Sequence, residues 1–123
     1  MIPAPASLVP MAHVRDVARS IAFYRRLGFE VANTVTPPGA TAPIWAMIGT
    51  DRARLMLNLA DGEVDPDQQA ILFYLYFEDI DAVHADLAGA GFAVGAMRYP
   101  PHRPRGEFSL LDPDGYCLVL THS

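Results

Sequence analysis

The sequence contains one short motif twice, 63 positions apart. An aspartate is followed twelve residues later by a Gly-Phe pair in both halves, and the apolar positions around these residues also match. A period this long that occurs only twice indicates two copies of one supersecondary unit, not a solenoid. The recurring residues are Asp16, Gly28 and Phe29 in the first copy and Asp79, Gly91 and Phe92 in the second.

Each copy predicts a strand, a helix and three further strands. Apolar runs of strand length come first, and the aspartate after each run is suited to be a helix N-cap. The helices have an apolar stripe, and the glycine of each Gly-Phe pair stands where a left-handed C-terminal cap is needed. The predicted strands are 7–14, 29–35, 43–49 and 54–59, then 71–77, 92–99, 107–111 and 116–121; the helices are 17–28 and 80–91, and "DPDG" at 112–115 predicts a tight reversal.

A chain of 123 residues is long enough for one core, so we expect a single domain, 1–123. Module one covers about 7–60 and module two about 70–122, joined by an acidic linker, 61–69. Hydrophobic residues make up 51% and charged residues 19%, as in compact globular proteins.

Composition also limits the location and the partners. There is no basic leader and no apolar run long enough to span a bilayer, so we expect a cytoplasmic protein without a membrane partner. A single cysteine, Cys117, excludes an internal disulfide and fits a reducing compartment. Basic residues do not cluster on a helix, so a nucleic-acid partner is not expected.

Two segments, "VPMAHVRDVARSIAFYRRLGFEV" (9–31) and "RGEFSLLDPDGYCLVL" (105–120), carry a specific resemblance. They are similar to the vicinal oxygen chelate superfamily, which includes glyoxalase I, extradiol dioxygenases and bleomycin-resistance proteins, and most similar to the bleomycin-resistance branch. The resemblance spans nearly the whole chain. It implies an α+β fold in which two βαβββ modules form a curved mixed sheet around a cleft, a small-molecule ligand in that cleft, and a homodimer.

The resemblance also permits a test for a metal site. Enzymes of this superfamily hold a divalent ion with His, Glu or Gln at four positions, on the first and last strands of each module. The matching positions here are Val9, Leu72, Val119, and Met56 or Asn58. Aliphatic side chains offer no lone pair to a hard cation. We therefore expect no metal and no cofactor, and we find no pairing of a nucleophile with a base that would indicate catalytic residues.

Alternation along the strands predicts which side chains face the cleft. In the first strands Ala12 and Val14 are expected against the helices and Met11 and His13 toward the cleft. In the second module Phe73, Leu75 and Phe77 are expected against the helices. The candidate ligand-binding residues are Met11, His13, Trp45, Met47, Asn58, Tyr74, Tyr76, His102 and Arg105.

Several of these assignments have alternatives. His13 is either a hydrogen-bonded wall residue or a ligand-contacting, acid/base group. Trp45 and Met47 belong either to the cleft wall or to the core. The loop "RYPPHRPRGEF" (98–108) is either a rim of the site or a solvated surface loop, and its arginines argue against a cationic drug such as bleomycin. His84 is expected in solvent on the polar side of its helix.

The sequence thus favours a metal-free small-molecule-binding protein of the bleomycin-resistance type, which sequesters an aromatic or antibiotic-like ligand. Two alternatives stay open. One is a glyoxalase- or dioxygenase-like enzyme, a lyase or isomerase, with a displaced or absent metal site. The other is a scaffold or regulator whose cleft is vestigial.

Overall fold

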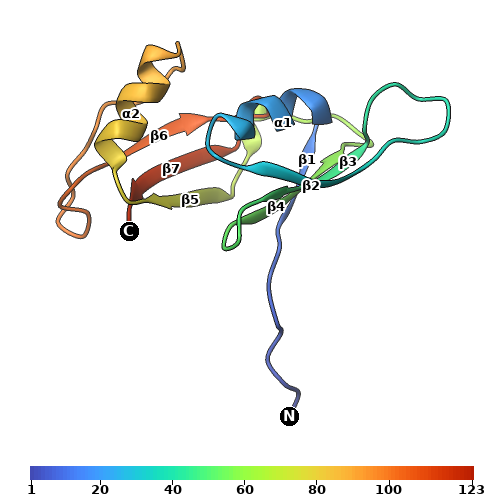
Figure 1. Cartoon of the computed structure of the whole chain (residues 1–123), viewed down its shortest axis with the longest axis horizontal. Helices are drawn as coiled ribbons and strands as arrows, with labels where there is room; N and C mark the ends of the chain where they lie inside the picture. The colour runs from blue at the N-terminus through green and yellow to red at the C-terminus, as the bar shows by residue number, and fades with distance from the viewer. The chain divides into compact units, whose positions relative to one another are not determined.

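The computed structural model describes residues 1–123 and divides them into two compact units, Met1–Val64 and Asp65–Ser123. Each unit contains one copy of the repeated motif, built as a sheet with one α-helix (Figure 1). The strands form one mixed sheet of four and one of three, as the α+β assignment predicts. Neither helix is long and apolar enough to cross a membrane.

The first unit has the predicted order of strand, helix and three strands. Its sheet runs β1-β4-β3-β2, with β1 parallel to β4 and the other pairs antiparallel. The helix packs against β3 and β4, and the core beneath it contains Val14, Val17 and Leu57. The elements are β1 (Met11–Val14), α1 (Val17–Arg25), β2 (Glu30–Val35), β3 (Trp45–Gly49) and β4 (Arg54–Leu59).

The second unit has a three-stranded sheet in the order β5-β7-β6, with β5 parallel to β7 and β6 antiparallel to it. Its core side chains Phe108, Leu118 and Leu120 are fully buried on the face that carries α2. The elements are the short 3-10 helix η1 (Pro66–Gln68), β5 (Leu72–Phe77), α2 (Ile80–Gly89), β6 (Glu107–Leu111) and β7 (Cys117–His122).

Both helices begin and end as the repeated motif predicts. The Asp16 carboxylate accepts a hydrogen bond from the Arg19 amide at 3.1 Å, and Asp79 does the same for Ala82 at 3.0 Å. Gly28 has φ 90°, and its counterpart in the second unit has φ 89°. The regular helices stop a few residues before these glycines because the last residues form the capping turn.

The predicted strand 92–99 does not form, so the second unit has two strands after its helix and not three. Val94 donates to the carbonyl of Phe92 in a three-residue turn, which interrupts an extended ladder there. Only Gly95, bonded to the Ser109 carbonyl, and Arg98, bridged to Glu107, pair with β6. The apolar content of this segment predicted a strand, and that prediction is wrong because strand formation also depends on pairing with a partner strand.

The "DPDG" segment makes the predicted tight reversal between β6 and β7. Gly115 has φ 84° and donates to the Asp112 carbonyl at 3.0 Å. A Cβ on Gly115 would lie 2.2 Å from the carbonyl oxygen of Pro66, so this turn packs directly on η1. Glycine is required here by both the backbone conformation and the space.

Candidate ligand-binding faces of the two sheets

The face of the first sheet opposite α1 carries two rows of side chains across the strands. Residues that pair in register point to the same face. Met11, Met56 and Met47 are aligned in one row. The next row consists of His13, Asn58 and Trp45.

This arrangement brings together the five candidates predicted in the first unit. Trp45 and Met47, which the sequence assigned equally to core or cleft, alternate with the fully buried Ala46 and Ile48 and are themselves only partly buried. Met11 is 46% exposed beside the buried Ala12. The thioethers and the indole make this face polarisable and aromatic. The His13 imidazole and the Asn58 amide add hydrogen-bonding groups to it.

The face of the second sheet opposite α2 changes from apolar to polar along the strands. Its three rows follow from the pairing of β5 and β6 with the central strand β7. The first row is wholly non-ionic and mostly aliphatic, the second holds a phenol and a hydroxyl, and the third holds a phenol, a hydroxyl and a carboxylate. The rows are Leu72, Cys117 and Leu111, then Tyr74, Val119 and Ser109, then Tyr76, Thr121 and Glu107.

The alternation predicted for β5 agrees with the observed burial. Tyr74 and Tyr76 are 47% and 53% exposed, whereas Phe73 and Leu75 are partly buried on the helix side. The ring of Phe73 stacks on the buried Tyr116, with centroids 5.7 Å apart. Both predicted tyrosines therefore lie on the face opposite α2.

The loop 99–106 sends its two candidate residues in different directions. His102 lies by the third row, with its Nε2 3.9 Å from the Glu107 carboxylate. The Arg105 amide donates to Nε2 of His122, and the Arg105 guanidinium contacts that ring and the Ser123 carbonyl. His122 alternates with Thr121 and lies on the helix side of β7, so Arg105 does not join the tyrosines.

Two charged residues outside the predicted set lie on this face. The Arg103 guanidinium sits over the Tyr76 ring, 5.1 Å from its centroid, and donates to the phenol oxygen at 3.2 Å. Glu107 is 7% exposed and lies 3.6 Å from the Arg98 guanidinium. The basic character of the loop indicated Arg103, whereas the position of Glu107 follows only from the pairing of β6 with β7.

His84 does not lie in solvent as expected. Its Nε2 is 3.0 Å from the Gly95 carbonyl oxygen, and its ring lies edge-on to Phe108 with centroids 4.6 Å apart. The side of α2 that reads as polar is covered, because β6 and the segment after α2 pack against it. His84 is therefore a hydrogen-bonded packing residue.

The side chains present do not fit a divalent ion. Met56 and Asn58 lie on the face of the first sheet opposite α1, and Leu72 and Val119 lie on the face of the second sheet opposite α2. We call these two faces the open faces because no helix covers them. Nowhere do three His, Cys, Asp or Glu residues gather in a way that could hold a metal. Thioether and aliphatic side chains are poor partners for a hard cation.

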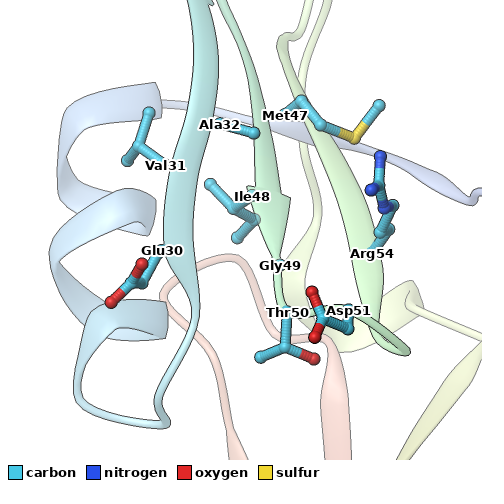
Figure 2. A pocket seen from close by; sticks show the side chains of 9 residues that line it. All are labelled: Glu30, Val31, Ala32, Met47, Ile48, Gly49, Thr50, Asp51 and Arg54. Carbon is cyan, nitrogen blue, oxygen red and sulfur yellow. The ribbon is translucent and has the colours of Figure 1, made fainter.

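A pocket of about 230 Å³ lies at the end of β3 and β4 in the first unit. Met47 is its one residue from the predicted set, and Figure 2 shows the Met47 and Arg54 side chains directed toward one another. Asp51 and Thr50 border the pocket from the turn that connects β3 and β4, so polar groups lie near Met47. The lining residues are Glu30, Val31, Ala32, Met47, Ile48, Gly49, Thr50, Asp51 and Arg54.

The protein consists of two related units. Each unit has a helix on one face of a mixed sheet and an aromatic or thioether-rich face opposite, and this arrangement defines a paired-module α+β protein. Residues 9–120 match the model of the Glyoxalase/Bleomycin resistance protein/Dioxygenase superfamily. The chain belongs to this superfamily. No protein with a curated description matches the sequence.

Solved structures of this fold include both binding proteins and an enzyme. A bleomycin resistance determinant encoded on the transposon Tn5 is 21% identical over 97% of this chain and 98% of its own, with a TM-score of 0.74. A bleomycin-binding protein from Streptomyces verticillus, complexed with copper(II)-bleomycin, is 20% identical over 99% of each chain, with a TM-score of 0.71.

A lactoylglutathione lyase from Agrobacterium tumefaciens is 20% identical over 98% of this chain and 96% of its own, with a TM-score of 0.66. Identities this low establish a shared fold, and one fold hosts unrelated activities. The function of this chain is therefore argued from its own side chains.

Proposed function

We propose that this protein is a metal-free small-molecule-binding protein of the bleomycin-resistance type, which sequesters an aromatic or antibiotic-like ligand in the cytoplasm. The observation that carries the proposal is the composition of the two open sheet faces. They present methionines, an indole and two phenols, while the positions at which superfamily enzymes hold a metal carry aliphatic, thioether or amide side chains.

Such faces suit the binding of a flat, partly apolar molecule. Aromatic rings and thioethers bury large apolar area against a ring system and adapt to its outline. The hydroxyls of Tyr74 and Ser109 and the amide of Asn58 supply a few hydrogen-bonding groups that fix orientation. Sequestration requires affinity alone, and a micromolar dissociation constant corresponds to about 8 kcal/mol.

A titration monitored by Trp45 fluorescence tests the proposal, because Trp45 is the one tryptophan in the chain and lies on an open face. A panel of polycyclic aromatic natural products, with bleomycin included, is titrated into purified protein. We expect at least one compound to bind with a micromolar or lower dissociation constant. A panel without binders would refute the proposal.

Paired variants locate the binding. Tyr74→Ala removes an exposed phenol from the open face of the second sheet, and we expect it to weaken binding about tenfold. Ile71→Ala removes a similarly exposed side chain just before β5 and serves as the matched control. Equal affinities of both variants and the parent protein would exclude this face.

The enzyme alternative is tested by elemental analysis of dialysed protein. A stoichiometric divalent ion would overturn the metal-free part of the proposal and favour lyase or isomerase chemistry. A homodimer is proposed from the superfamily resemblance, and light scattering after size-exclusion chromatography tests it: a mass of one chain at micromolar concentration contradicts it.

A further inference from the structure

We infer that Arg103 is the recognition point for a carboxylate on the ligand, and that the second unit binds an aromatic carboxylate along β5. This inference rests on the proposed function and adds the chemical class of the ligand. It is carried by the placement of Arg103 over Tyr76, by the unmet hydrogen-bonding capacity of its guanidinium, and by the polarity gradient of the open face.

The loop holds Arg103 firmly before any ligand arrives. The Arg103 amide donates to the Pro100 carbonyl at 2.8 Å, and the Gly106 amide donates to the Arg103 carbonyl at 2.9 Å, so two consecutive turns meet at this residue. The ends of the loop are fixed by the two main-chain hydrogen bonds between Arg98 and Glu107. A pre-positioned guanidinium loses little conformational freedom on binding.

The Arg103 side chain has no carboxylate partner in the protein. It contacts Tyr76, through the ring face and through one hydrogen bond from Nη2 to the phenol. Its Nε is buried without any hydrogen-bond acceptor. A guanidinium has five N–H donors in a planar fork that matches a carboxylate, and the phenol of Tyr76 accepts from only one of them.

The surrounding charges favour an anion at this point. Glu107 is the one carboxylate in the third row, and the Arg98 guanidinium lies 3.6 Å from it. Its charge is therefore compensated locally, whereas that of Arg103 is not. A carboxylate next to a partly desolvated guanidinium forms a charge-assisted hydrogen bond, which is stronger than the hydrogen bond that a neutral amide forms there.

The aromatic part of the ligand is placed by the same geometry. Tyr74 and Leu72 continue along β5 from Tyr76, each about 7 Å further on because alternate strand residues share a face. A two-ring system with a terminal carboxylate spans the step of about 7 Å from Tyr76 to Tyr74. Its carboxylate meets Arg103 while its rings cover Tyr74.

The test compares 2-naphthoate with 2-naphthamide, which have the same shape but differ in charge. Calorimetric titration gives their affinities, and amide chemical shifts of β5 and β7 in ¹⁵N spectra locate them. We expect wild-type protein to bind the carboxylate about tenfold more tightly than the amide, as a charged hydrogen bond predicts. Arg103→Gln should remove this preference, and Arg103→Lys should retain part of it.

Two further variants separate recognition from folding of the loop. Arg105→Gln changes an arginine of the same loop that contacts His122 instead, and the preference should persist. Tyr76→Phe keeps the ring but removes the phenol that holds the guanidinium, and the preference should fall.

Equal binding of both probes to wild-type protein, or a preference that survives Arg103→Gln, would overturn the carboxylate inference and leave the proposed function intact. If neither probe shifts any resonance of β5 or β7 and the wider aromatic panel also fails, both are overturned.

Discussion

The Phe29 amide donates to the Tyr24 carbonyl at 3.1 Å, and the rings of these two residues meet edge-on with centroids 5.5 Å apart. Gly28, between them in the chain, donates to the Arg25 carbonyl. This is the six-to-one and five-to-two hydrogen-bond pattern of a Schellman cap, with its usual apolar contact. The second unit repeats it at Leu87, Ala88, Gly91 and Phe92. The duplicated Gly-Phe pair therefore encodes one helix-to-strand joint twice.

A pair of alanine substitutions at the end of α2 tests this joint. Gly91→Ala should destabilise the protein by about 1 kcal/mol, because φ 89° is unfavourable for alanine although no atom obstructs its Cβ. Gly89→Ala, two residues earlier within the helix, should instead stabilise by about 0.5–1 kcal/mol. Urea unfolding of both variants gives the two free energies; changes of equal sign would contradict the cap.

Gly115→Ala should be more harmful than Gly91→Ala. The positive φ contributes a similar cost, and in addition the new Cβ would meet the Pro66 carbonyl, so η1 must move. We expect a loss of about 2–4 kcal/mol in the free energy of unfolding. The comparison with Gly91→Ala isolates the steric part, and equal losses at both glycines would show that the turn does not pack on η1.

The helix N-caps should contribute comparably in the two units. Asp16→Ala and Asp79→Ala each remove a hydrogen-bond acceptor from the first turn, and each should cost about 1 kcal/mol. Asparagine at either position keeps a side-chain oxygen and should retain most of that stability. Thermal unfolding followed by circular dichroism measures all four variants; an asparagine as costly as alanine would indicate that charge, not capping, is responsible.

The two faces of the second sheet should differ sharply in their sensitivity to truncation. Leu118→Ala, on the fully buried helix side, should cost about 2–5 kcal/mol. Leu72→Ala, on the opposite face and 54% exposed, should cost less than about 1 kcal/mol. Chemical denaturation distinguishes them, and similar costs would show that the face bearing Leu72 is covered in solution.

Local signals predicted most of the fold, and long-range pairing accounts for the differences. The caps at Asp16 and Asp79 and the bounds of β4 and β6 follow from nearby residues, and the structure confirms them. The segment 92–99 is predicted as a strand because it is apolar, but hydrogen bonding to β6 requires a register that sequence does not reveal. His84 was misplaced for the same reason, since its cover comes from distant residues.

The candidate side chains divide along the same line. Alternation within β1 and β5 placed Met11, His13, Tyr74 and Tyr76 on the open faces, as the pairing registers confirm. The alternation of side chains along a strand does not apply in the loop 99–106, where consecutive turns determine which way each side chain points. Two arginines only two positions apart, Arg103 and Arg105, therefore reach opposite faces of the sheet. Whether the open-face residues bind a ligand stays a prediction.

The strand order has a consequence for biosynthesis. In each unit the final strand is an inner one: β4 separates β1 from β3, and β7 separates β5 from β6. While β7 has not yet left the ribosome, β5 and β6 cannot pair, because β7 is the strand that lies between them in the sheet. The second unit is thus open to aggregation and to chaperone capture until β7 is in place.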